Sequence, residues 1–176
     1  MGYPSNLVLD LFSGTGSATQ PFVECGKHRV VRVDIAGKPD VRADVRHLPL
    51  KGPFEFVWAS PPCTEYSYAR ARGLFKWIDP DLSCWRAVPI DGPYVIENVL
   101  GARRWWGPSS YHWGPWHLWT NLRLGFMPTG KPERKTRAGG GPNGTWGRGK
   151  GNATIPRPLA EAVHRAVCEQ SHTIVP

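Results

Sequence analysis

Few residues in this chain suit a disulfide-stabilised, metal-binding or membrane protein. Only four cysteines occur among 176 residues, and they lie far apart, with no Cys-x-x-Cys pair and no nearby histidine pattern. This spacing argues against a disulfide framework and a zinc site, and it suits a reducing compartment. No apolar run approaches membrane-spanning length, and the N-terminus lacks the basic-then-apolar pattern of a signal peptide. We therefore expect a cytoplasmic protein without a metal or a membrane contact.

Acidic residues are scarce in one segment only. Residues 101–150 carry nine Lys and Arg side chains against a single acid, whereas residues 1–100 carry eleven of each sign and residues 151–176 two of each. The whole net charge of +8 therefore falls in residues 101–150, which also hold six of the nine tryptophans. Basic side chains interleaved with aromatic ones are typical of segments that bind a polyanion such as nucleic acid. A solvated loop whose tryptophans cap a small core is the alternative.

The chain alternates between apolar β-type runs and helix or turn signals. We predict strands over residues 7–12, 29–33, 40–45, 54–59 and 93–96, and helices over residues 18–25 and 158–170. This order predicts an α/β fold with a Rossmann-like, mostly parallel sheet and helices on both faces. We expect one domain, residues 1–176, in which residues 101–150 form an irregular basic insert. On the last helix, His164 and Arg165 are expected to face solvent.

A glycine-rich turn and two acids suggest a cofactor site. The first strand runs into Ser13-Gly14-Thr15-Gly16-Ser17 and then a helix, an arrangement that lets backbone approach a cofactor at a helix N-terminus. Asp34 ends the second strand, twenty residues after Gly14, where nucleotide-binding domains place an acid that accepts hydrogen bonds from ribose hydroxyls. Asp44 ends the third strand in the same way. Together they indicate an adenosine-type cofactor, although a tight turn and solvated strand-end acids give the same pattern.

A cysteine follows the fourth strand on a stiff loop. The apolar run stops at Pro61-Pro62, which cannot continue a hydrogen-bonded ladder and therefore hold Cys63 beyond the carboxyl end of the strand. Ligands of open α/β sheets bind at that edge, so Cys63 is a candidate nucleophile. A small buried cysteine in a Pro-rich loop is the alternative. The fifth strand ends in Glu97, which is expected at the same edge unless it is an ordinary water-facing acid.

These segments, in this order, resemble the cytosine-C5 DNA methyltransferases. Residues 10–16 look like the first cofactor motif of that family, Asp34 like its ribose-binding acid and Asp44-Val45 like its adenine-side motif. Ser60-Pro61-Pro62-Cys63 resembles the nucleophile loop, and Glu97-Asn98-Val99 resembles the Glu-Asn-Val motif. Gly151-Asn152-Ala153 is similar to the final motif, which packs beside the cofactor. The matches cover residues 7–100 and 151–168.

The resemblance implies methyl transfer from S-adenosylmethionine to C5 of cytosine in DNA. Cys63 would add to C6 of the base, Glu97 would be the acid near N3, and Asn98 would position the loop. The residues implied to bind the cofactor are Phe12, Gly14, Thr15, Gly16, Ser17, Asp34, Ile35, Asp44, Val45, Pro61, Asn152 and Ala153. Those expected to bind nucleic acid are Ser67, Arg103, Arg104, Arg123, Arg134, Lys135 and Arg137. A base inside a duplex would have to be flipped out of the stack.

The sequence departs from that family in two respects. The Gln-x-Arg-x-Arg motif is missing, and Arg123 or the Arg103-Arg104 pair are the candidate replacements. Only about fifty residues separate Asn98 from the final motif, too few for the family's target-recognition domain, which leaves open a separate partner for target recognition. Two alternatives therefore stand beside DNA methylation. One is the same chemistry on RNA or a free cytosine nucleotide, and the other is a nucleic-acid-binding protein without turnover.

Overall fold

A seven-stranded sheet forms the centre of the protein. The computed structural model describes residues 6–63, 66, 86–89, 91–132 and 154–171. In spatial order the strands are β3 (Val41–Arg42), β2 (Arg29–Asp34), β1 (Leu7–Leu11), β4 (Phe56–Ala59), β5 (Tyr94–Asn98), β7 (Trp116–Thr120) and β6 (Tyr111–Trp113). The first five of these, β3, β2, β1, β4 and β5, are parallel to one another. Strand β7 is antiparallel to both of its neighbours, β5 and β6. The predicted α/β, Rossmann-like, mostly parallel sheet is confirmed.

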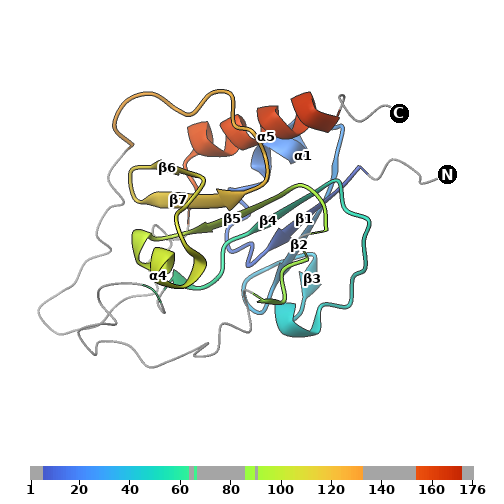
Figure 1. Cartoon of the computed structure of the whole chain (residues 1–176). Helices are drawn as coiled ribbons and strands as arrows, with labels where there is room; N and C mark the ends of the chain where they lie inside the picture. Colours follow the sequence, from blue (N-terminus) through green and yellow to red (C-terminus); the bar gives the residue numbers. More distant parts are fainter. Residues whose placement is uncertain (1–5, 64–65, 67–85, 90, 133–153, 172–176) are drawn as a thin grey trace, which may run out of the picture.

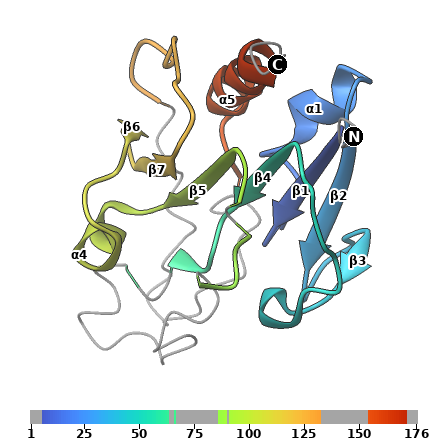
Figure 2. The ribbon, with the colours of Figure 1, turned by 45° about the vertical axis from the view of Figure 1, so that its right-hand side comes forward.

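Two helices cover one face of this sheet. Helix α1 (Gln20–Glu24) begins with a proline in its first turn and ends before Gly26, which has a φ of 68°. Helix α5 (Arg157–Ser171) packs beside it, as Figures 1 and 2 show. Phe22 and Leu159 of these helices join Trp58 of β4 in one buried cluster. Within the described part of the chain, no helix combines the length and the apolar character that crossing a membrane would need.

Shorter elements cover the opposite face. These are the 3-10 helices η1 (Val45–His47) and η3 (Leu100–Ala102) and the single-turn helix α4 (Arg103–Trp106). A second buried cluster lies on this side and includes Leu9 of β1 and Ile96 of β5. Tyr66, from the loop after Cys63, belongs to the same cluster. This face therefore packs against the segments that follow β3, β4 and β5.

Most predicted elements differ from the observed ones by one to three residues at an end, and two of these differences have reasons that lie in tertiary structure. Strand β5 extends to Asn98, because Glu97 and Asn98 pair with β7. The predicted third strand shrinks to Val41–Arg42, because Asp44 caps η1 by accepting a hydrogen bond from the N–H of Arg46. Both changes affect residues at the carboxyl edge of the sheet, where the candidate site lies.

Part of the predicted basic insert belongs to the sheet. Residues 111–120 form the β6–β7 hairpin, which adds two strands beyond β5. Residues 133–150, which carry five of the nine Lys and Arg side chains of residues 101–150, lie outside the described residues. The hairpin is therefore a structural component of the domain, built from a stretch that composition alone marks as irregular.

Candidate active site

The parallel strands bring three predicted motifs to one edge of the sheet. Strands β1 and β4 are neighbours, with Leu11 opposite Ala59, and β4 is the neighbour of β5, with Ala59 opposite Ile96. The glycine loop leaves β1, the Pro-Pro-Cys loop leaves β4, and η3 follows β5 at this same edge (Figure 2). In open α/β sheets such an edge holds the ligand.

The glycine loop begins with an unusual backbone turn. Phe12 has a φ of 57°, which is rare for a residue other than glycine, and it is followed by Gly14 at 52° and Gly16 at 72°. A side chain at Gly16 would collide with the guanidinium group of Arg32. Thr15 is exposed within the loop. A left-handed Phe12 is a strained conformation of the kind found at ligand-binding turns.

A buried acid closes the base of this loop; it is the first residue of the predicted cofactor motif, but sequence reasoning assigned it no separate role. Asp10, in the middle of β1, is 1% exposed and accepts a hydrogen bond of 2.6 Å from the hydroxyl of Thr19. The bond joins the strand before the loop to the residue that precedes α1. Desolvation raises the pKa of Asp10 to about 7, against the lowering effects of the Thr19 hydroxyl and of Arg32.

The predicted ribose-binding acid lies directly against the glycine loop. The carboxylate of Asp34 accepts hydrogen bonds from the N–H of Gly14 at 2.9 Å and the N–H of Ala36 at 3.0 Å. A carboxylate oxygen has two acceptor sites, so each can still accept a ribose hydroxyl. The neighbouring Ile35 is 68% exposed, which leaves an apolar surface beside the acid. The residues present at this edge therefore fit a nucleoside cofactor.

Three other predicted cofactor residues have partners within the protein. Asp44 forms an ion pair with Arg46, whose side-chain and backbone hydrogen bonds lower the pKa of Asp44 to about 2. The side chain of Val45 packs in the core, so a cofactor at this edge would meet its backbone. The hydroxyl of Ser17 accepts a hydrogen bond of 2.9 Å from the N–H of Ile155. Ser17 thus joins the glycine loop to the segment that leads into α5.

A buried amide ties the Cys63 loop to β5. Asn98 is 1% exposed; its Nδ2 donates to the carbonyl of Pro61 at 2.9 Å and its Oδ1 accepts from the N–H of Val99 at 2.9 Å. Cys63 is exposed at the end of the loop, and Glu97, the neighbour of Asn98, is 8% exposed. The amide therefore links the loop that carries the thiol to the strand that carries the carboxyl group, which is the contact that a positioning role requires.

The chain beyond Cys63 packs closely on η3. A Cβ atom at Gly101 would collide with the carbonyl oxygen of Tyr66. The buried ring of Tyr66 lies 4.9 Å from the ring of Trp106 and 5.4 Å from that of Trp105. Only glycine permits so close a backbone approach, so Gly101 helps to fix the path of the loop after the candidate nucleophile.

A cavity of about 330 Å³ lies beside this loop. It is lined by Tyr66, Val99, Leu100, Gly101, Gly114, Pro115 and His117. His117 stands opposite Asn98 in the β5–β7 ladder, is 5% exposed, and has its Nδ1 2.9 Å from the hydroxyl of Ser109. Burial lowers the pKa of His117, and the charges of His112 and Arg103 lower it further, so a neutral imidazole lines the cavity at pH 7. Sequence reasoning missed His117, because its position depends on the antiparallel register of β7.

Of the predicted nucleic-acid-binding arginines, two lie near this edge and one does not. Arg103 and Arg104 are exposed on α4, and the guanidinium group of Arg104 lies 5.7 Å from the ring centre of Trp105 (Figure 1 places α4 beyond the end of β5). Arg123 exchanges two hydrogen bonds through its backbone with the side chain of Gln170, near the end of α5. Because β7 runs antiparallel, it carries Arg123 to the opposite edge. The suggestion that Arg123 replaces the missing motif is therefore wrong.

Six further predicted residues lie outside the described residues: Ser67, Arg134, Lys135, Arg137, Asn152 and Ala153. Their roles stay predictions from the sequence. The described segment nearest to the last two begins at Thr154, and Ile155 within it contacts the glycine loop through Ser17.

Comparison with protein-family models and with curated proteins finds no match to the chain. Among solved structures, the chain is similar to a crystal structure of a Burkholderia thailandensis 1,6-didemethyltoxoflavin-N1-methyltransferase with bound 1,6-didemethyltoxoflavin and S-adenosylhomocysteine. The identity is 21%, the TM-score is 0.34, and the match covers 65% of this chain and 52% of that one. The chain thus spans about half the length of that protein. A likeness this weak assigns neither chemistry nor substrate to the present chain.

Proposed function

We propose that this chain is an S-adenosylmethionine-dependent methyltransferase that methylates C5 of cytosine in DNA through a covalent adduct with Cys63. The observation that carries the proposal is the hydrogen bond from the buried amide of Asn98 to the carbonyl of Pro61. This bond couples the Pro-Pro-Cys loop to the strand of Glu97. A thiol-bearing loop and a carboxyl-bearing strand therefore end at the edge from which the glycine loop also leaves.

The residues that would hold the cofactor are those of the glycine loop together with Asp34 and Ile35. S-adenosylmethionine would supply the methyl group as an electrophilic sulfonium. Asp34 has acceptor sites left for ribose hydroxyls, and the exposed Ile35 offers an apolar surface for the adenine ring. Phe12 and Gly14 turn the backbone at the edge where this nucleoside would lie.

The proposed chemistry explains the need for a thiol and an acid together. C5 of cytosine is a weak nucleophile because it belongs to an aromatic ring. When the thiolate of Cys63 bonds to C6, the aromaticity is broken and C5 becomes electron-rich. Glu97, either protonated or sharing a proton with N3, takes up the negative charge that builds on the ring. The electron-rich C5 would take the methyl group from the sulfonium, whose S–CH3 bond breaks so that the donor leaves as the neutral thioether. Loss of the C5 proton to a base, followed by elimination of the Cys63 thiolate, would then restore the aromatic ring.

Exposed basic and aromatic side chains favour a polymer over a free nucleotide as substrate. Arg103, Arg104 and the 43%-exposed Trp105 lie on α4, close to the carboxyl edge, where they would contact phosphate and stack on bases. Three further basic residues predicted to bind nucleic acid, Arg134, Lys135 and Arg137, lie outside the described residues and support a polymer substrate only through the sequence. The same chemistry on RNA or a free cytosine nucleotide is the second candidate, and nucleic-acid binding without turnover is the third.

The decisive experiment incubates the protein with tritiated S-adenosylmethionine and, separately, duplex DNA, single-stranded DNA, RNA and dCTP. A parallel set contains 5-fluorocytosine, which cannot lose its C5 substituent as a proton and therefore traps the covalent adduct. We expect label and a trapped adduct on DNA with the wild type. Cys63→Ala should give neither, while its affinity for the cofactor, measured by calorimetry, stays close to that of the wild type.

Other outcomes separate the candidates. If only RNA or only dCTP is labelled, that molecule replaces DNA as the assigned substrate. Substantial turnover by Cys63→Ala excludes the covalent mechanism. Cofactor binding with no label on any substrate favours a binding protein or a missing partner. For a polymer substrate, replacing Arg134, Lys135 and Arg137 with alanine should flatten the salt dependence of binding, because fewer counterions are released. An unchanged salt dependence removes that segment from the interface.

A further inference from the structure

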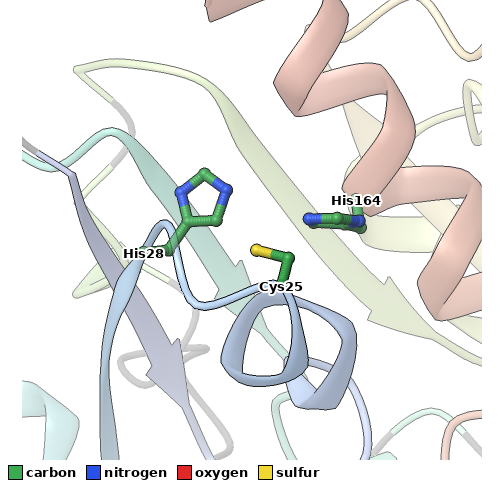
Figure 3. A group of neighbouring side chains, drawn as sticks. All are labelled: Cys25, His28 and His164. Carbon is green, nitrogen blue, oxygen red and sulfur yellow. The ribbon is translucent and has the colours of Figure 1, made fainter.

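Four side chains with metal-binding atoms meet at the end of the sheet opposite the candidate active site. Cys25 and His28 lie in the turn between α1 and β2, and His164 and Cys168 lie one helical turn apart on α5. The ligand atoms of Cys25, His28 and His164 all lie within 4.8 Å of one another. Figure 3 shows the sulfur of Cys25 pointing into the space between the two imidazole rings. The sulfur of Cys168 is 3.4 Å from Nε2 of His164 and 3.7 Å from Nε2 of His28.

This cluster corrects two expectations drawn from the sequence. The predicted absence of a cysteine–histidine pattern is wrong, because the pairs Cys25-x-x-His28 and His164-x-x-x-Cys168 come together from opposite ends of the chain. The predicted solvent-facing His164 is also wrong. Its ring packs edge-on against Phe22 at 4.7 Å and against His28 at 5.7 Å. Neither pair is distinctive alone, and only the packing of α5 on α1 joins them.

A partly buried carboxylate orients one of the two histidines. Nδ1 of His28 lies 2.8 Å from Oε2 of Glu55, and the two side chains are 6% and 16% exposed. With Nδ1 donating to Glu55, the unprotonated Nε2 of His28 is left facing Cys168. Histidines that bind metals usually donate their other ring N–H to such a carboxylate, which fixes the tautomer and the ring orientation. His28 therefore has the outer-sphere partner that a metal ligand needs.

The donor types suit zinc, and the two distances from the sulfur of Cys168 to the histidines match those of a tetrahedral site. Zn–S bonds of about 2.3 Å and Zn–N bonds of about 2.0–2.1 Å place sulfur and nitrogen ligands about 3.6 Å apart on a tetrahedron. The two distances from the sulfur of Cys168, 3.4 and 3.7 Å, lie on either side of this value. Two thiolates and two imidazoles form the donor set of closed structural zinc sites, in which no position remains for water or substrate.

We propose that Cys25, His28, His164 and Cys168 bind one Zn²⁺ ion as a structural site. The ion would fasten the far end of α5 to the turn between α1 and β2. This turn lies at the amino edge of the sheet, since the N–H of Arg29 bonds to the carbonyl of Asn6, just before β1. The site is therefore remote from the Cys63 edge, and it stands independently of the proposed methyltransferase function.

The first test needs no variant, so misfolding cannot confuse it. The 176-residue chain, produced with supplementary zinc and freed of any affinity tag, is analysed for metal by mass spectrometry, and we expect about one zinc per chain, as a closed four-ligand site holds. Replacement of zinc by Co²⁺ should give the visible bands of tetrahedral cobalt and a thiolate-to-cobalt charge-transfer band. Protein that carries no zinc and gives no cobalt spectrum overturns the proposal.

Variants then assign the ligands. Cys25→Ser and Cys168→Ser should each lose the zinc and the charge-transfer intensity, whereas the matched control Cys63→Ser should keep both. Glu55→Gln retains all four ligands and should weaken zinc affinity about 10- to 100-fold, measured by competition with a chelator. Chelation should lower the Tm of the wild type. An unchanged Tm on chelation, or full zinc content in Cys168→Ser, contradicts the assigned site.

Discussion

The wild type should lose stability as the pH rises, because the buried Asp10 ionises, and Asp10→Asn should remove this loss. Asp10 is almost fully buried, and desolvation raises its pKa from 3.8 to about 7. At a pH between these two values, Asp10 is protonated in the folded chain but ionised in the unfolded chain. The free energy of unfolding therefore falls as the pH rises from the unfolded pKa to the folded pKa. A difference of about 3 pKa units, at about 1.4 kcal/mol each, amounts to about 4 kcal/mol above pH 7. This is a large share of the stability of an ordinary domain, about 5–15 kcal/mol.

The assay is urea denaturation of the wild type and Asp10→Asn over a range of about pH 4 to pH 9. Because all other titrating groups are common to both chains, the difference in their free energies of unfolding isolates Asp10. The asparagine oxygen can still accept the hydrogen bond of Thr19, so the closure of the glycine loop is kept. We expect the advantage of the variant to grow by about 4 kcal/mol from pH 4 to pH 8 and then to level off.

Two further results bear on the same reasoning. Thr19→Val removes the hydroxyl that lowers the pKa of Asp10, so it should move the upper end of the pH-dependent step to higher pH. A difference between Asp10→Asn and the wild type that stays constant over the whole range would refute the reasoning, because it would mean that Asp10 is not desolvated in the folded protein.

Three predictions concern the candidate active site. Asp34→Ala should weaken S-adenosylmethionine binding in calorimetry, and an unchanged Kd would remove Asp34 from the site. Asn98→Ala leaves the carbonyl of Pro61 without its donor, so it should lower stability by about 1–3 kcal/mol and reduce methylation more than cofactor binding; equal losses of both would argue against a positioning role. Gly101→Ala collides with the carbonyl of Tyr66, so it should lower both Tm and methylation, and a variant with wild-type values would contradict the close packing of this loop.

The centre of the parallel half of the fold could be predicted because its strands β1 and β4 are buried on both faces. Strand β4 is apolar from end to end and β1 is apolar except for Asp10, and both are bounded by turn residues, so both strands can be predicted from the sequence. The β6–β7 hairpin is harder to predict from the sequence, since its short strands lie in a stretch rich in tryptophan and basic residues. Its pairing with β5 also sets the end of that strand, which local sequence signals do not determine.

The candidate site divides in the same way. Contacts such as Asp34 with Gly14 and Asn98 with Pro61 follow from parallel strands that end at a common edge, which is why the motif order predicts them. The positions of His117 and Arg123 depend on the antiparallel register of β7. The sequence alone could therefore not predict that His117 lies beside Asn98 while Arg123 lies at the opposite edge of the sheet.

Helix α5 is held at both of its ends by contacts that join distant parts of the chain. Before its first turn, the N–H of Ile155 bonds to the hydroxyl of Ser17 in the glycine loop, and near its last turn the sulfur of Cys168 contacts His28. Because the helix runs from the carboxyl edge of the sheet to the amino edge, the proposed zinc site and the proposed cofactor loop lie at opposite ends of one rigid element. The metal would therefore act on the cofactor loop only through the seating of α5. Helix α1 has only five residues, so α5 is the principal cover of this face of the sheet. An ion that fixes the end of α5 would therefore stabilise the packing of the whole face.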